Sequence, residues 1–259
     1  MQRPLLVDGS KFDVGVYVLM LVGSRPGRTT SLRTLVYNEL SLRFCGADYP
    51  GHGVREPTAE ELLAAPSEAL FVADRFRGFW NFPSMKPHLH LGAKAALANI
   101  IGPSSMDRID RNVDSILASA SAAVLERATD AHSGLENATR WSIHGNRYWE
   151  LMRFDCFVDE SLSVSVVEIN MSPNQWPHNP GKGEVPYDDT SWRHKLQDDV
   201  LLEVAAWAST GFLREDAERR GGDVATGFRE VWRGEKSLPE PAHLRGPNRS
   251  LPHRRRYFP

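Results

Sequence analysis

Residues 148–174, YWELMRFDCFVDESLSVSVVEINMSPN, predict two β-strands joined by a polar turn. The second half of the stretch, residues 164–169, is mostly β-branched, and residues 152–158 are mostly apolar, as strands favour. Residues 159–162, Asp-Glu-Ser-Leu, supply a turn signal between them. The stretch therefore predicts a hairpin within a largely antiparallel sheet.

Three side chains of this hairpin have the spacing of a metal site. With a four-residue turn, Asp155 lies opposite Val166, and side-chain alternation puts Asp155, Glu168 and Asn170 on one face. Asp155 and Glu168 are then diagonal neighbours, about 7–8 Å apart at Cα. Mg²⁺ typically takes one or two carboxylates together with phosphate oxygens. The spacing predicts a Mg²⁺ site to which Asn170 adds a neutral oxygen.

A simpler interpretation is a half-buried hairpin whose acids face solvent, because alternating polar residues mark any solvated strand face. Two features favour the metal site. Glu168 and Asn170 lie inside a very apolar run, and residues 171–174 form a turn signal that leaves Asn170 at the end of its strand.

Several blocks of the sequence resemble the tubulin–tyrosine ligase-like family, whose members are ATP-grasp enzymes. They are FDCFVDE at 154–160 with VVEINMSPN at 166–174, RPLLVDGSKFDVGVYVL at 3–19, and YNELSLRF at 37–44. The resemblance covers roughly residues 2–210 in the family's order. Three further blocks are most similar to the tubulin polyglutamylases of the family: LRFC at 42–45, ELMRFD at 150–155 and RRRYFP at 254–259.

This resemblance implies a fold and a division of the chain. The expected fold is α+β, the C-terminal portion of an ATP-grasp domain, with a mainly antiparallel sheet and flanking helices. Residues 1–215 would form this partial domain. Residues 216–259, rich in charge, Pro and Gly and poor in apolar periodicity, are expected to be a poorly ordered tail.

The resemblance also assigns roles to individual residues. Asp155, Glu168 and Asn170 match the family's Mg²⁺ ligands. Lys11 and Asp13 match positions that contact ATP, and Arg43 matches an arginine that faces the γ-phosphate and supports catalysis. Lys11 and Arg43 are expected across a cleft from the metal ligands.

The implied activity is ligation of glutamate to glutamate side chains of tubulin, with ATP and Mg²⁺ as cofactors. In this chemistry a carboxylate becomes an acyl phosphate, which an amine attacks to form an amide. Metal ions and cationic side chains stabilise the charge on the phosphoryl group. The expected partners are glutamate and the acidic tails of tubulin in microtubules, in the cytoplasm and the cytoskeleton.

Two departures from the family pattern bear on this activity. The family's K-F-D-x-R motif has an arginine where this chain has Gly15, on the face that Lys11 and Asp13 share. That arginine helps to hold a substrate in the family, so another cation such as Arg153 could replace it.

The second departure is that the family's first subdomain precedes the block at residues 3–19, whereas here only residues 1–2 do so. The resemblance therefore predicts weak binding of Mg·ATP by this chain. It also leaves an alternative open, a non-catalytic microtubule-associated module derived from the ligase fold.

Composition is that of an ordinary globular protein, with 41% hydrophobic and 25% charged residues among 259. A net charge of −2 gives no general attraction to nucleic acid or membranes, although a basic run at 253–256 could face an acidic tail. The two cysteines, Cys45 and Cys156, suit a reducing compartment. No signal peptide is visible, and the apolar run at residues 14–22 is too short to span a bilayer as a helix.

Other elements follow from local patterns. A capping box, Thr58-x-x-Glu61, predicts a short helix through residue 65. Apolar periodicity predicts helices over residues 105–128 and 189–209. Residues 32–37 and 40–44 are expected to form a hairpin around Asn38-Glu39.

Overall fold

The structure of the chain is a computed structural model that describes residues 3–25, 29–51, 56–72, 76–134, 147–171, 173, 189–210 and 226–237. Its elements, in chain order, are β1 (Leu6–Val7), β2 (Ser10–Arg25), β3 (Thr29–Phe44), α1 (Ala59–Ala64), α2 (Ser67–Leu70), β4 (Arg77–Gly78), the 3₁₀ helices η1 (Phe79–Asn81) and η2 (Lys86–Leu91), α3 (Ala93–Ile101), α4 (Pro103–Gly134), β5 (Arg147–Val158), β6 (Val164–Met171), α6 (Asp189–Thr210) and β7 (Phe228–Ser237).

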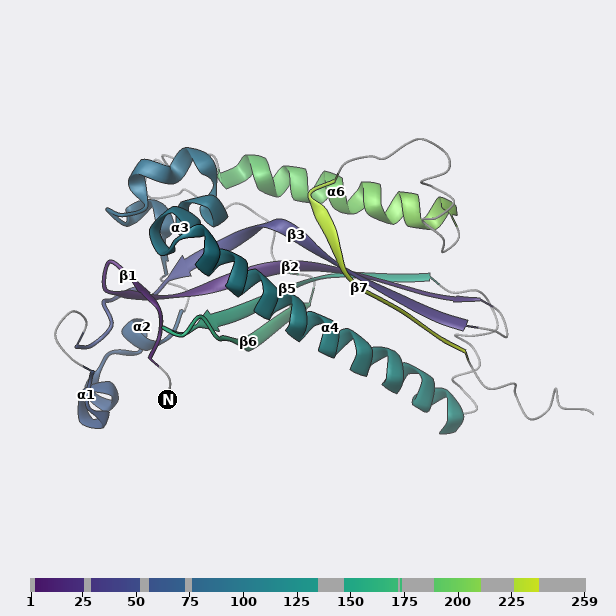
Figure 1. Cartoon of the computed structure of the whole chain (residues 1–259), viewed down its shortest axis with the longest axis horizontal. Helices are drawn as coiled ribbons and strands as arrows, with labels where there is room; N and C mark the ends of the chain where they lie inside the picture. Colours follow the sequence, from purple (N-terminus) through teal and green to yellow (C-terminus); the bar gives the residue numbers. More distant parts are fainter. Residues whose placement is uncertain are drawn as a thin grey trace, which may run out of the picture.

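The described strands form one antiparallel sheet. Its main order is β4-β3-β2-β5-β6, with β1 also pairing with β2, and β7 with β3. The long strands β2 and β3 run through its middle (Figure 1). The α+β prediction of an antiparallel sheet with flanking helices is confirmed.

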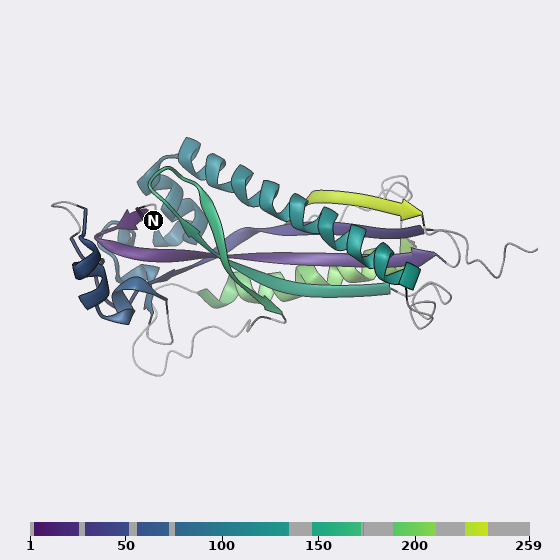
Figure 2. The same cartoon turned by 90° about the horizontal axis from the view of Figure 1, so that it is seen from below.

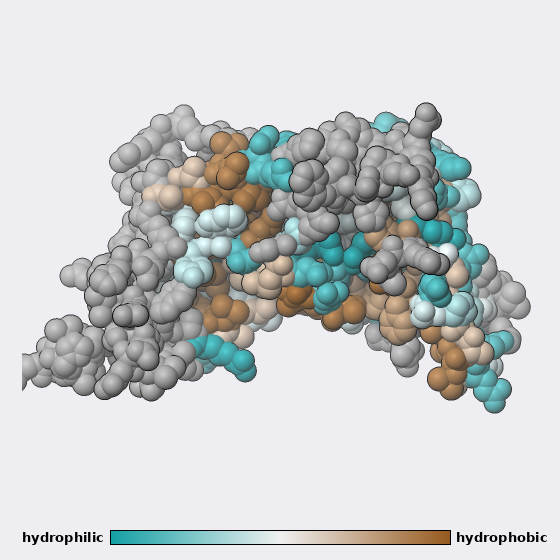
Figure 3. Space-filling view, turned by 180° about the vertical axis from the view of Figure 1, so that it is seen from behind, coloured by the Kyte–Doolittle hydropathy of each residue, from teal (hydrophilic) through white to brown (hydrophobic). Residues whose placement is uncertain are grey.

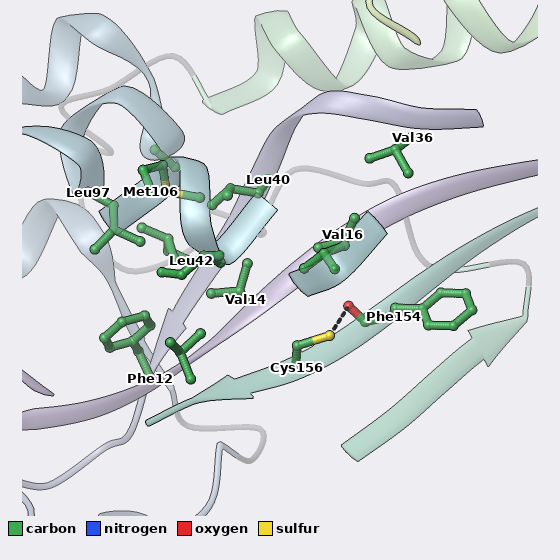
Figure 4. Packing of buried hydrophobic residues seen from close by; sticks show 14 of the residues in the cluster. Phe12, Val14, Val16, Val36, Leu40, Leu42, Leu97, Met106, Phe154 and Cys156 are labelled. Atoms are coloured by element: carbon green, nitrogen blue, oxygen red, sulfur yellow. Dashed lines mark hydrogen bonds between the residues drawn. The ribbon is translucent and has the colours of Figure 1, made fainter. Parts of the chain in front are cut away.

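Helices cover both faces of this sheet, which explains the near-continuous apolar sequence of β2. Figure 2 shows α4 on one side of the strands and α6 on the other. On the α4 side, alternate residues of β2 such as Phe12, Val14 and Val16 lie in a cluster with Leu97 and Met106 (Figure 4). On the α6 side the intervening residues form a second cluster: Tyr17, Leu19 and Leu21 with Leu196, Val200 and Trp207.

The predicted helices are confirmed. Thr58 and Glu61 form both hydrogen bonds of the capping box that begins α1. The helix predicted over residues 105–128 lies within α4, and the helix predicted over 189–209 is α6. In the described part of the chain, no helix has the length and hydropathy needed to cross a bilayer.

The hairpin predicted around Asn38-Glu39 is wrong, because β3 continues through these residues. Val16 pairs with Leu40, and Val18 pairs with Val36, so extra residues of β3 form an irregularity opposite β2. The long partner strand keeps the chain extended where a turn signal alone predicts a reversal.

The tail predicted over residues 216–259 is also wrong in part, because residues 228–237 form β7 on the edge of β3. The Phe228 ring lies 5.0 Å from that of Tyr37. Arg229 binds both carboxylate oxygens of Asp114 on α4, at 2.7 and 2.8 Å. These partners are distant in sequence, so local composition carried no signal of them. Residues 216–225 and 238–259 lie outside the described residues.

Some apolar surface stays exposed. On the outer strand β6, the exposed fractions are 56% for Val167, 47% for Ile169 and 61% for Met171. Figure 3 shows hydrophobic and hydrophilic patches side by side on one side of the molecule. The edge strand β6, which carries the predicted metal ligands Glu168 and Asn170, is thus less covered than its neighbour β5.

Candidate functional site

The pairing of β5 with β6 brings the predicted metal ligands together, but in a register that differs from the predicted one. Asp155 lies directly opposite Glu168, and Arg153 lies opposite Asn170. The predicted pairing of Asp155 with Val166 is wrong, because the turn has five residues and Val158 pairs with Val164.

A β-bulge restores the predicted face. The five-residue turn alone would shift the strands by one residue and send Glu168 to the opposite face of the sheet. The register instead shifts between Asp155 and Cys156, because Cys156 pairs with Val166 and one extra residue, Val167, is accommodated. Asp155, Glu168 and Asn170 therefore share a face, as the sequence predicted.

The turn is closed by the side chain of Asp159. Its Oδ1 accepts hydrogen bonds from the backbone N–H groups of Ser161 at 2.9 Å and Ser163 at 2.8 Å. Leu162 adopts a positive φ of 64°. These bonds fix the length of the turn, and so the register that leads to the bulge.

Arg43 joins two acids from neighbouring strands. Its Nε and Nη2 bind the two oxygens of Asp13, at 3.0 and 2.6 Å. Its Nη2 also lies 2.7 Å from Oδ2 of Asp155. Asp13 pairs with Arg43 in the sheet, which explains this contact. The predicted phosphate-facing arginine thus contacts a predicted metal ligand directly.

Arg153 completes the cluster from the same strand as Asp155. Its Nε and Nη2 bind Oδ1 and Oδ2 of Asp155, at 2.6 and 2.9 Å. The pKa of Arg153 is raised: burial lowers it, but the hydrogen bond and charge of Asp155 outweigh burial, and Tyr17 adds to the rise. Two carboxylates and two guanidinium groups balance in charge.

Gly15 lies beneath the side chain of Arg153. Gly15 pairs with Asp155 on one side and Ser41 on the other. A Cβ at Gly15 would lie 3.0 Å from Cδ of Arg153 and 3.2 Å from Cβ of Ser41. Arg153 therefore occupies the space above the glycine, and its guanidinium group is bound to Asp155 beside it.

Glu168 and Asn170 face Asp155 with different contacts. Nδ2 of Asn170 donates a hydrogen bond to Oδ2 of Asp155 at 2.8 Å. Glu168 is exposed and, within the described residues, has no hydrogen-bond or ion-pair partner.

These residues fit a Mg²⁺ ion in donor chemistry, since all three can present oxygen ligands. The described residues contain no group of three His, Cys, Asp or Glu side chains placed to hold a metal. A metal here would therefore depend on two carboxylates and the Asn170 amide, with its oxygen turned inward. That is a donor set which leaves positions for phosphate oxygens.

The ammonium group of Lys11 is bound outside the carboxylate cluster. Its Nζ donates to the backbone oxygen of Leu70 at 2.7 Å and lies 3.7 Å from the centre of the Phe157 ring. Burial lowers its pKa, against the charges of Cys45 and Asp13. A phosphate contact by Lys11 would require its ammonium group to leave the Leu70 carbonyl.

Asp13 is a buried acid of the cluster whose ionisation is altered by its surroundings. Burial raises its pKa from 3.8 to about 6, while the charge and hydrogen bonds of Arg43 oppose the rise. Burial likewise raises the pKa of the Cys45 thiol to about 11 and that of the Cys156 thiol to about 12, which suits inert core thiols.

Sequence reasoning missed Ser41 and Tyr17 as neighbours of the site. Both are buried, and both lie on the face of Gly15. The signal for Tyr17 was available, because it follows Gly15 by two residues in a strand. Ser41 could not be placed without the pairing of β2 with β3.

Three curated proteins are similar in sequence. A probable tubulin polyglutamylase of Caenorhabditis elegans is 27% identical over 178 residues, covering 66% of this chain and 30% of that protein. A tubulin polyglutamylase of Danio rerio is 23% identical over 178 residues, covering 67% and 21%. A probable beta-tubulin polyglutamylase of Tetrahymena thermophila is 22% identical over 246 residues, covering 93% and 19%. The chain thus spans less than a third of each relative.

The model of the tubulin-tyrosine ligase family matches residues 1–60 and 109–202, more than half of the chain. A similar solved structure is the C-terminal domain of Pby1 from K. lactis, described as an ATP-grasp enzyme interacting with the mRNA decapping enzyme Dcp2. The TM-score is 0.46 with 16% identity, over 89% of this chain and 50% of that one.

Proposed function

Because this chain belongs to the tubulin-tyrosine ligase family, we propose that it carries the Mg²⁺- and phosphate-binding part of an ATP-dependent ligase. The proposed reaction is addition of glutamate to glutamate side chains of tubulin, with ATP as co-substrate. The names of the similar proteins, tubulin polyglutamylases, support this choice of substrates. The proposed location is the cytoplasm, at the microtubule cytoskeleton.

One observation carries the proposal. Asp155 and Glu168 lie opposite each other on one sheet face, with Asn170 beside them and Arg43 bonded to Asp155. Carboxylates that can hold Mg²⁺, with a cationic side chain beside them, are parts that enzymes of phosphoryl transfer recurrently use.

Each residue has a proposed task. Asp155, Glu168 and Asn170 would hold Mg²⁺, which when bound neutralises phosphate charge. Arg43 would bind the γ-phosphate, since its planar fork can grip two oxygens. Asp13 would keep Arg43 oriented through its two hydrogen bonds. Lys11 would contact ATP. The substrate carboxylate takes the phosphoryl group and ADP leaves; the amine then displaces phosphate to form the amide.

Calorimetric titration of Mg·ATP into the 259-residue chain tests the nucleotide site. We expect weak binding that Glu168→Gln abolishes. Glu126→Gln, an exposed carboxylate of α4, is the matched control and should bind as the wild type does. Incorporation of radiolabelled glutamate into tubulin tests the ligation itself. Equal binding by wild type and Glu168→Gln would contradict the assignment of Glu168.

A second candidate is a non-catalytic microtubule-associated module. It is favoured by the charge balance of the cluster, because arginines bind both oxygens of Asp155. Cosedimentation with microtubules, together with absence of nucleotide binding and of glutamate incorporation, would support this module over the ligase.

A further inference from the structure

Three side chains bind the Asp155 carboxylate, and most of their contacts are with Oδ2. Oδ1 accepts from Nε of Arg153 at 2.6 Å. Oδ2 is contacted by Nη2 of Arg153 at 2.9 Å, Nη2 of Arg43 at 2.7 Å and Nδ2 of Asn170 at 2.8 Å. An ionised carboxylate offers about four acceptor positions. About two of these positions belong to each oxygen, so a metal ion that binds Asp155 through Oδ2, which has three donors, must displace at least one of them.

Arg153 is the donor that metal binding would release. Arg43 keeps a second carboxylate, since it binds both oxygens of Asp13, and Asn170 can turn its own oxygen toward a metal. Within the described residues, Arg153 has no carboxylate partner besides Asp155. Its side chain is only 13% exposed, so water alone would solvate its charge poorly.

A largely buried guanidinium group without a counter-charge is costly, and binding an anion removes this cost. Arg153 already grips Asp155 with two nitrogens on two oxygens, which is the geometry suited to a carboxylate. Gly15 has no side chain, and this leaves room for the side chain of Arg153 above it, next to Asp155.

We propose that Arg153 is a metal-coupled carboxylate-binding residue: it pairs with Asp155 when no metal is bound, and with a carboxylate of the acidic substrate when Mg²⁺ occupies Asp155. This proposal rests on the proposed function and deepens it, since it names the residue that selects an acidic substrate. The carboxylate belongs either to free glutamate or to an acidic peptide tail.

The first test measures metal binding alone. Mn²⁺ is titrated as a paramagnetic probe into wild type, Arg153→Gln and Arg153→Lys, with Arg111→Gln on α4 as an exposed control. Arg153→Gln should bind Mn²⁺ more tightly than wild type by ~10-fold or more, because a competing cation is gone. Arg153→Lys should be intermediate, and the control unchanged.

The second test measures coupling between metal and carboxylate. In wild type, Mg²⁺ should raise the affinity for the carboxylate ligand by ~5-fold or more, and the ligand should raise Mg²⁺ affinity by the same factor. Arg153→Gln should abolish this coupling. L-glutamate and hexaglutamate are titrated separately to distinguish the amino acid from the peptide tail, with hexaglutamine as the neutral control. Thermal unfolding of each variant verifies that it is folded.

Different results separate the two proposals. If wild type and Arg153→Gln bind Mn²⁺ equally, or if Arg153→Gln binds it more weakly, the role of Arg153 is overturned while the metal site stands. Absence of coupling to either carboxylate ligand in wild type also overturns it. If no variant binds metal, the metal site and the role of Arg153 both fail.

Discussion

Asp155 lies directly opposite Glu168 between β5 and β6, yet the two carboxylates have different surroundings. The Asp155 side chain is 3% exposed and is bound by two arginines, whereas Glu168 is exposed and has no partner in the described part of the chain. The first holds the cluster together and the second is available to a ligand.

This contrast predicts different costs of substitution. Asp155→Asn should lower the free energy of unfolding by about 3–5 kcal/mol, because it leaves two buried guanidinium groups short of negative charge. Glu168→Gln should change it by less than about 0.5 kcal/mol, as an exposed substitution does. Urea denaturation of both variants without metal measures the difference, and similar costs would contradict it.

Asp13 should make stability depend on pH. Its pKa is raised from 3.8 to about 6, so the folded state favours the protonated form. Its contribution to stability is greatest below about pH 4 and is lost as the pH rises through about 6. The free energy of unfolding of wild type minus that of Asp13→Asn should therefore fall by about 2–3 kcal/mol between about pH 4 and pH 7, at 1.36 kcal/mol per pKa unit. Asp107→Asn on α4, an exposed position, is the matched control, and a fall of the same size with this variant would contradict the assignment to Asp13.

Gly15 and Arg153 should be energetically coupled. A Cβ at Gly15 would lie 3.0 Å from Cδ of Arg153, so Gly15→Arg should crowd this side chain and add a third cation to the cluster. Arg153→Gly should relieve both effects. A double-mutant cycle by thermal or urea unfolding should give a coupling energy of about 1–2 kcal/mol in favour of the double variant. Additive costs would mean that Ser41, at 3.2 Å, is the main obstacle.

Gly15→Arg also tests the role of the arginine that the family's K-F-D-x-R motif has at this position. If the proposed ligation holds and Gly15 reflects a relaxed site, Gly15→Arg should raise glutamate incorporation into tubulin. If it lowers incorporation, and Arg153→Ala abolishes it, Arg153 is the replacement cation. The contacts of Arg153 described above favour this second outcome.

Phe228 should be needed for stability even though it lies in the segment whose composition predicted disorder. It is 9% exposed and its ring contacts that of Tyr37. Phe228→Ala should cost about 3 kcal/mol, the lower range for a buried aromatic residue. Glu235→Ala, exposed on the same strand, should cost less than about 0.5 kcal/mol. Equal midpoints in urea for the two variants would show that β7 does not belong to the folded unit.

The sequence by itself determined the elements that local patterns specify. Capping residues and apolar periodicity predicted α1, α4 and α6. Alternation along β5 and β6 predicted that Asp155, Glu168 and Asn170 share a face. These features depend on residues a few positions apart, and the resemblance to the family rested on the same short blocks.

Only the tertiary structure decided how those elements pair. The β-bulge at Val167, the cover of Gly15 by Arg153 and the addition of β7 to β3 each join residues far apart in the chain or depend on strand register. Register is set by the sum of hydrogen bonds and packing along two strands, which no single stretch encodes. The sequence therefore predicted that these three side chains share a face, and the sheet decided that Asp155 is held by two arginines.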